Sequence, residues 1–446
     1  MRIVITVLRM LSGLFLLCLL TSSLHAQEYD WARLKRYRPT HPYDEDMGYV
    51  LLDMLSASES SRSPVLRRLP SIAFGPTVRV GCSTLLGLDG VANLFPDFND
   101  VDGLWLGYEM QLDHSLSEGR KIMFRTSQNY TLKTRRWFSE NNILIYHSPK
   151  RDGLLVLSGG HTSRETVHMA PYELFTEQYV GLPGTNSDIH HYRKWYVSTR
   201  HKLYLSPHFR YSALLQYEDR SPQVFGTDLV RHRALTSELR LIYNLKRNHK
   251  ERPSYPTPIV MPAGQDGIEA GLTLRAGITP TKTEDTPFSE YKMWEVSLRS
   301  AQAFSPNHKV DFLIIGGSFW DQGWQSDADM RHFPRLSLMG RSNLGESWHT
   351  LPAEWMGTKR WMATGINYYA NHFLLGLFLP VDEGLHLRSL HLSGNKDYIE
   401  GGYSVGFGRM ARIGLFVGSD LVEPPNVAVR ISLPFIYLIS TWSERY

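Results

Sequence analysis

The sequence has 446 residues, of which 48 are basic and 44 are acidic, so its formal net charge is +4 at pH 7. This near balance, with both signs spread along the chain, argues against a nucleic-acid-binding protein, which would gather basic residues on one surface. The length suits either two ordinary soluble domains or one large β-barrel.

Residues 1–26 have the layout of a secretory signal peptide. Arg2 and Arg9 give a basic start, an apolar run follows, and small residues lead to Ala26. The apolar run is well short of the roughly 20 residues that a membrane-spanning helix needs. We therefore expect this leader to be removed on export. Cys82 would then be the one remaining cysteine, which excludes an intrachain disulfide and thiolate metal clusters.

Residues 27–75 have a different character. Acidic residues at 44–46 precede Met47, Val50 and Leu51, which are spaced as on one face of a helix. Acidic side chains favour the first turn of a helix because they offset its dipole. We therefore expect a short helix followed by a polar linker. This stretch would lie in the periplasm or line the mouth of the domain that follows, and the sequence leaves both open.

From residue 76 to residue 446, segments of about ten residues alternate between apolar and polar side chains, as half-buried strands do. In the clearest case Ile268, Ala270 and Leu272 would face one side of a strand and Glu269 the other. The same alternation occurs in residues 104–112, 209–218, 235–244, 399–408 and 427–435.

These segments predict strands that cross a membrane rather than strands of a soluble sandwich. Sandwich strands usually run about five or six residues, whereas these are longer and carry aromatic residues near their ends, as a lipid interface requires. The 11 Trp and 23 Tyr of the chain suit such interfaces. The longest apolar run after the leader, residues 373–381, is too short for a spanning helix. Residues 76–446 are therefore predicted to form an all-β fold, a transmembrane antiparallel β-barrel of about 14 strands, between about 12 and 16.

Residues that favour turns predict compact connections at 149–153, 305–308 and 393–397. Longer polar or Gly- and Pro-rich connectors run through residues 162–191, 219–233, 246–266 and 321–358. Membrane barrels have short periplasmic turns and long outer loops. We therefore expect the long connectors to be extracellular.

Charged side chains on the polar faces of the predicted strands form the main candidate site. A charge on the lipid face would cost about 2–4 kcal/mol near the middle of the membrane, so these side chains should face the lumen. They could line a water-filled pore and set its selectivity, or brace a closed interior through ion pairs. The predicted lumen-facing charges are Glu109, Glu238, Arg240, Glu269, Arg275, Glu295, Arg299, Glu400 and Arg430.

Two motifs suggest other chemistry. Residues 402–406 match the G-x-S-x-G nucleophile elbow, but that site needs a sharp strand-to-helix turn, and here the residues fall within a predicted strand. His190 and His191 lack partners at familiar metal-ligand spacing. Barrel-borne hydrolases combine Asn, His and Ser, or Asp and His, from neighbouring strands, which a sequence cannot reveal because the partners meet across the sheet. We therefore predict no catalytic, cofactor-binding or metal-binding residues.

Three stretches carry a family resemblance. Residues 101–107 look like a barrel-entry strand, residues 159–162 and 190–196 flank a long loop, and residues 397–408 are similar to a closing strand. Together they resemble a Bacteroidota outer-membrane β-barrel family of unknown function. Its longer members carry an N-terminal carboxypeptidase-regulatory-like domain, which we do not expect here because residues 27–75 leave no room for it. The family has no established catalytic residues, so the resemblance implies a location and no activity.

The sequence as a whole predicts an integral outer-membrane protein of a Gram-negative cell envelope. Its expected partners are outer-membrane lipids and, during insertion, the barrel-assembly machinery, with no nucleic acid and no cofactor. The favoured function is a non-enzymatic channel or envelope scaffold. A hydrolase of lipid or surface peptide and a surface receptor using the long loops remain as alternatives. The solute, the partner and the oligomeric state are left open.

Overall fold

The computed structural model describes residues 77–432 with internal gaps. The gaps are at residues 82, 89–96, 100, 117–119, 149–150, 152, 164–191, 207, 224–229, 247–266, 281–285, 306–307, 334–338, 341–343, 346, 353–354, 371–372, 376–380, 395 and 408–410. The predicted signal peptide, the helix expected after residue 44, Cys82 and the pair His190–His191 lie outside the described residues.

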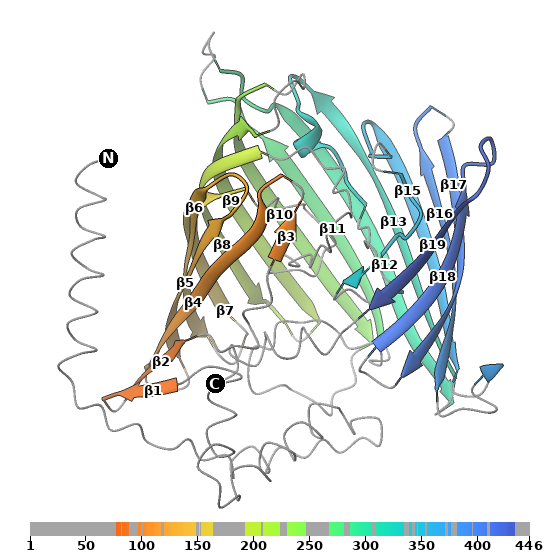
Figure 1. Ribbon diagram of the computed structural model, residues 1–446, viewed down its shortest axis with the longest axis horizontal. Helices are drawn as coiled ribbons and strands as arrows, with labels where there is room; N and C mark the ends of the chain where they lie inside the picture. The colour runs from red at the N-terminus through yellow and green to blue at the C-terminus, as the bar shows by residue number, and fades with distance from the viewer. Residues whose placement is uncertain are drawn as a thin grey trace, which may run out of the picture.

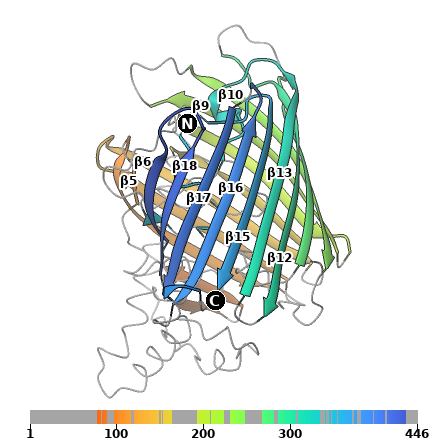
Figure 2. The ribbon, with the colours of Figure 1, turned by 90° about the vertical axis from the view of Figure 1, so that its right-hand side faces the viewer.

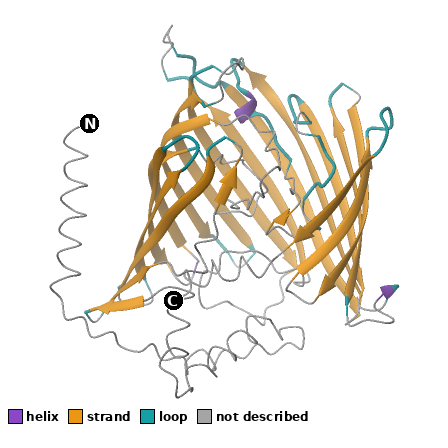
Figure 3. Cartoon of the chain, in the orientation of Figure 1, coloured by secondary structure: helices purple, strands orange, loops and turns teal. Residues whose placement is uncertain are grey.

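The described chain is built almost entirely of β-strands (Figures 1 and 3). The first strands are β1 (Thr77–Val80), β2 (Thr84–Leu88), β3 (Asp97–Asn99), β4 (Gly103–Ser115), β5 (Lys121–Thr131), β6 (Arg136–Ser148), β7 (Gly153–Thr162), β8 (Tyr192–Tyr204), β9 (Phe209–Pro222) and β10 (His232–Lys246). The others are β11 (Gly267–Gly277), β12 (Tyr291–Ser305), β13 (His308–Gln322), β14 (Met339–Gly340), β15 (Arg360–Ala370), β16 (Asp382–Leu392), β17 (Lys396–Phe407), β18 (Ala411–Ser419) and β19 (Asn426–Ser432). A 3₁₀ turn, η5, spans Asp327–Asp329. No helix in the described ranges is long and apolar enough to cross a membrane.

All the strands belong to one sheet of 19 strands. Each strand from β4 to β13 pairs antiparallel with the next, β13 pairs with β15, and β15 to β19 continue the series. The tilted strands curl round an interior to form a barrel-like wall (Figures 1 and 2). Among the described pairings, none joins β19 to β4 at the two ends of the series. The all-β antiparallel fold predicted from the sequence is confirmed.

The strand count also agrees with the prediction. Ten strands from β4 to β13 and five from β15 to β19 make fifteen that are seven residues or longer, within the expected range. Most are longer than the five or six residues usual in a soluble sandwich. The longest, β10, β12 and β13, each contain 15 residues.

The two faces of the wall have opposite character. In β16, Leu385 and Leu387 are exposed, whereas His386 and Arg388, which alternate with them, are buried. Exposed apolar side chains continue along the same face of the other strands, for example Val197, which is 66% exposed. Soluble monomers rarely expose apolar patches beyond a few hundred Å², so this outer face suits a lipid environment.

The opposite face, the inner face, is covered in part by a segment between β13 and β15. The described parts of residues 323–359, which carry η5 and β14, are called the inner segment below. Its Phe333, Trp348 and Leu351 join a buried apolar cluster with wall residues that include Tyr291 and Trp361. The inner segment therefore packs on the wall through an apolar contact as well as through the polar contacts described below.

One expected loop boundary was wrong. The connector predicted over residues 219–233 is shorter, because β9 continues to Pro222 and β10 begins at His232. Buried Arg220 and His232 belong to these strand ends. The polar residues there had predicted a loop. In the structure they belong to strands, and their polar side chains face the interior. The predicted compact turn at 305–308 is present, since Ser305 pairs with His308 across β12 and β13.

Candidate functional site

Charged side chains from neighbouring strands meet on the inner face. Glu238 on β10 lies directly opposite Arg275 on β11, and the Arg275 Nη2 and Glu238 Oε2 atoms are 2.6 Å apart. Arg240, two residues further along β10 and therefore on the same face, approaches Glu238 Oε1 at 3.4 Å. Directly opposite residues in antiparallel strands bring their Cβ atoms within about 5 Å. The register of the sheet thus builds this three-residue cluster.

The structure places the other predicted lumen charges on the same face. Glu269 lies opposite Arg299 in the β11–β12 ladder and is 8% exposed. Glu109 forms an ion pair with Arg125 of β5. Glu295 and Glu400 are both buried, and their partners lie outside the predicted set. Arg430 donates a hydrogen bond to the carbonyl oxygen of a residue in the inner segment.

Sequence reasoning missed the arginines that complete these pairs. Arg388 on β16 lies 2.9 Å from Glu400, and Arg331 on the inner segment lies 2.5 Å from Glu295. For Arg388 a signal exists, because the alternation of leucines at 385 and 387 with His386 and Arg388 is that of a barrel strand. For Arg331 none exists, since it lies in a connector that folds back on the wall.

One set of contacts fixes the start of the inner segment. Arg220 on β9 lies 2.8 Å from Asp329 of η5, and Ser289 donates a 2.5 Å hydrogen bond to the same carboxylate. Arg220 also pairs with Glu218, which accepts from Lys194 of β8 at 3.0 Å. The alternation of cation and anion leaves each buried carboxylate partnered, which matters because an unpaired buried charge is strongly destabilising.

The electrostatics of Asp329 follow from this arrangement. Burial by itself would raise the pKa of the Asp329 carboxyl, but the Arg220 guanidinium and the hydrogen bond from Ser289 hold it below its ordinary value of 3.8. The carboxylate is therefore charged across the whole neutral range, and the contact between η5 and β9 is a true ion pair there.

A second set of contacts fixes the end of the inner segment. Glu400 on β17 accepts hydrogen bonds from the backbone N–H groups of His349 and Thr350 at 2.8 and 2.7 Å. The Thr350 hydroxyl donates to the same Oε2 atom at 2.7 Å. Arg388 donates to Glu400 Oε1 at 2.9 Å and to the Leu344 carbonyl at 2.6 Å. One carboxylate thus joins two wall strands and the inner segment.

The arrangement supplies charge pairing and hydrogen bonding. In the described ranges, no group of three or more His, Cys, Asp or Glu side chains is placed to hold a metal ion. The G-x-S-x-G residues lie inside β17, as the alternation predicts, and not at a strand-to-helix turn.

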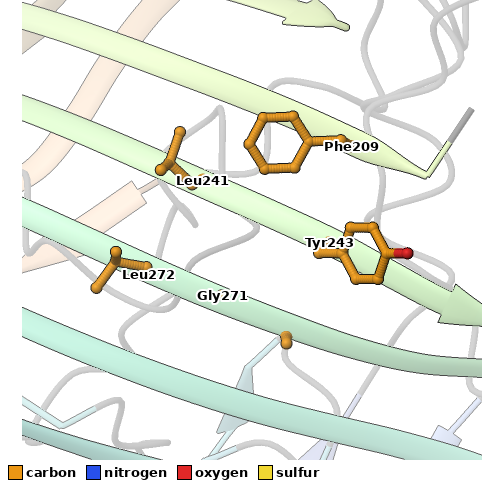
Figure 4. A pocket seen from close by; sticks show the side chains of 6 residues that line it. Phe209, Leu241, Tyr243, Gly271 and Leu272 are labelled. Atoms are coloured by element: carbon orange, nitrogen blue, oxygen red, sulfur yellow. The ribbon is translucent and has the colours of Figure 1, made fainter. Parts of the chain in front are cut away.

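A separate depression lies on the outer face and is not part of this site. It has a volume of about 290 Å³ and is lined by Phe209, Leu241, Tyr243, Leu272 and their neighbours on β9, β10 and β11. Figure 4 shows these apolar side chains side by side on the strands. Its lining is that of a surface against lipid chains, whereas the inner face carries the charges.

Comparison with known protein families gives one match. Residues 70–231 match the C-terminal domain of a family of unknown function, DUF5686. The matched region contains residues 101–107, 159–162 and 190–196 of the stretches that carried the family resemblance, and it extends from the first strands to the residue before β10. The match thus supports a family of unknown function. A search of curated proteins found no match.

Solved structures give weak likenesses. A mutant of the Rh. blastica porin is 8% identical with a TM-score of 0.34, and the alignment covers 74% of this chain and 89% of the porin. Pseudomonas aeruginosa OpdL is 9% identical with a TM-score of 0.34, over 74% of this chain and 90% of that one. The Escherichia coli ferric-catecholate import receptor Fiu is 7% identical with a TM-score of 0.30, over 79% and 66%. Scores this low carry no conclusion about function.

Proposed function

We propose that the protein is an outer-membrane channel for small polar solutes, narrowed by its inner segment. The observation that carries the proposal is the charged inner face with a chain segment bound to it, inside a wall whose outer face is apolar. A polar solute path needs charged groups along its lining, and the inner face carries them on strand after strand.

The inner segment would set the width of the path. It is bound near its start through Asp329 and Arg331, and further along through Glu400. Trp361 adds a hydrogen bond to Glu295 at 3.0 Å, so the carboxylate that receives Arg331 is itself held in place. A segment attached at three points on the wall would reduce the cross-section of the solute path without interrupting the pairing of the wall strands.

The test is conductance of the purified full-length protein in planar lipid bilayers. Replacement of Arg331 by Ala removes the contact to Glu295, so the inner segment should loosen and the single-channel conductance should rise about two-fold or more, with added current noise. Replacement of Arg231 by Ala serves as the matched control, because its ion pair with Asp219 is exposed and lies outside the inner segment. An Arg331→Ala channel indistinguishable from the wild type, or a wild type that never conducts, would overturn the proposal.

A further inference from the structure

Three side chains on consecutive strands of the inner face form a hydrogen-bonded chain that the channel proposal does not use. His386 on β16 lies 2.8 Å from the Oγ atom of Ser404 on β17 through its Nε2 atom. Its Nδ1 atom lies 2.8 Å from Oδ1 of Asn367 on β15. All three side chains are buried. The order of groups is that of a nucleophile, a base and a residue that orients the base.

The partners of Asn367 determine where the protons lie. Its Nδ2 atom donates to the Gly345 carbonyl at 2.9 Å, and a carbonyl can only accept. The Oδ1 atom must therefore accept from Nδ1–H of His386. This assigns the neutral imidazole the tautomer with a free lone pair on Nε2. The Ser404 hydroxyl then donates to that lone pair, as a serine nucleophile must before attack.

A cation stands beside the hydroxyl. The Nη1 atom of Arg412 on β18 donates to Ser404 Oγ at 2.9 Å, and its other end pairs with Asp382. Since Ser404 uses its hydrogen toward His386, Arg412 approaches the lone pairs that would carry negative charge after proton loss. A preorganised cation at this position stabilises an alkoxide or a developing oxyanion.

A glycine, Gly384, places no side chain against these atoms. A Cβ atom at Gly384 would stand 2.8 Å from Ser404 Oγ and 3.0 Å from both Arg412 Nη1 and His386 Nε2. Nucleophile, base and cation thus converge on the one position where this strand carries no side chain. A position within about 3 Å of both a nucleophile and an oxyanion donor is what acyl transfer requires.

We propose that Ser404 and His386 are the catalytic residues of a serine-hydrolase site for carboxylic esters, with Asn367 as the positioning residue. Ser404 Oγ attacks the ester carbonyl carbon while its proton passes to His386 Nε2, and Arg412 stabilises the oxyanion. The C–O bond to the alcohol breaks as His386 returns that proton to the leaving oxygen. A water molecule then gives its proton to His386, attacks the acyl-serine and releases the carboxylic acid, restoring the Ser404 hydroxyl.

The site is closed by the inner segment in this state. Gly345 contacts Asn367, and the fully buried Leu344 packs on Phe416, whose ring lies 5.5 Å from that of His386. Ester hydrolysis therefore requires the end of the inner segment to move away. Replacement of Thr350 by Val removes its hydroxyl contact to Glu400 without touching the three side chains, and should increase access.

The test uses the full-length protein in detergent with a fluorophosphonate probe, which labels activated serines covalently, and with p-nitrophenyl acetate and p-nitrophenyl decanoate as substrates. We expect labelling of the wild type or of Thr350→Val, and a fall on the order of 10³-fold in labelling and turnover in Ser404→Ala and His386→Gln. Ser297→Ala, which removes another buried serine of the inner face, should label like its parent. Preference for the acetate would indicate O-acetylated sugars, and preference for the decanoate would indicate lipid esters.

Asn367 is tested by a readout that folding alone would not move. Asn367→Asp keeps an acceptor for His386 and should retain turnover with an altered pH profile, whereas Asn367→Leu should lose turnover. The absence of labelling in both the wild type and Thr350→Val, or labelling that survives Ser404→Ala, would overturn the proposal. Channel conductance is expected to be unaffected in Ser404→Ala, so failure here would leave the channel proposal standing.

Discussion

A single carboxylate, that of Glu400, links more parts of the molecule than its position in a strand suggests. It receives the Arg388 guanidinium, two backbone N–H groups and a hydroxyl. Its side chain is 1% exposed, so these partners must replace the hydrogen bonds to water that the carboxylate loses on burial. Its partners depend on it as well, since Arg388 is buried beside it.

Replacement of Glu400 by Gln keeps the shape of the side chain and removes its charge. The buried Arg388 guanidinium would then lose the charge of the Glu400 carboxylate, and the free energy of unfolding should fall by about 3–5 kcal/mol. Urea-induced unfolding in lipid vesicles measures the change. Asp397→Asn is the control, because the ion pair of Asp397 with His391 is exposed at both side chains, so a change within about 0.5 kcal/mol is expected. Equal destabilisation by the two variants would contradict the role assigned to Glu400.

The inner segment is attached to the wall by two kinds of contact. Its apolar side chains pack on the wall, and its three polar anchor points are buried. Near its end, His349 donates from Nε2 to the Leu344 carbonyl at 2.9 Å, so the Nδ1 atom of the neutral ring carries no proton. Burial and then the nearby Arg388, with smaller effects from His386 and Arg430, hold the pKa of His349 well below its ordinary value of 6.5.

This depressed pKa makes the attachment of the inner segment sensitive to acid. A detached His349 would bind a proton near its ordinary pKa of 6.5, whereas the attached one resists it. The detached form thus binds more protons, and the attachment is complete above that value and weakens as the pH falls below it. We expect conductance to rise between about pH 7 and pH 5. The His349→Gln variant should show a flatter response, and an unchanged acid response in it would assign the effect elsewhere.

The sequence and the structure agree best where the chain is regular. Alternation located the strand around Ile268 and the strand around Leu239, because each has apolar side chains on its outer face and buried polar groups on its inner face. It could not locate Arg331 or Asp329, since a connector that folds back onto the wall has no periodicity to read. The group of Asn367, His386 and Ser404 was not predicted for a related reason. The register of three strands brings its members together, and their spacing along the chain does not.

The molecule carries apolar side chains on its outer face and charged side chains on its inner face, the reverse of a soluble protein. Val197 on β8, Met362 on β15 and Leu387 on β16 are each half exposed or more, while buried positions of the wall carry Glu, Arg and Lys. Such a distribution has a consistent physical explanation if lipid chains cover the outer face and the inner face is polar. The near-neutral net charge agrees with it, because several of the buried charges occur as pairs of opposite sign.

A charge on the outer face should therefore be costly. Replacement of Val197 by Arg should lower the free energy of unfolding in vesicles by about 2–4 kcal/mol if the strand centre lies at the bilayer midplane. Val197→Leu keeps the surface apolar and should change it by less than about 0.5 kcal/mol. Denaturant titration of both variants in the same lipid provides the comparison. A tolerated arginine would show that this face does not contact lipid.

The way in which the inner segment leaves and rejoins the wall has a consequence for how the molecule can be altered. β13 and β15 are directly paired, with Ser318 opposite Arg360, so the ladder does not depend on residues 323–359. A short hairpin turn could take the place of the segment and leave the existing strand pairings of the wall in register. Solute passage would then be altered through the inner segment alone, while the wall strands, which carry Asn367, His386 and Ser404, stay unchanged.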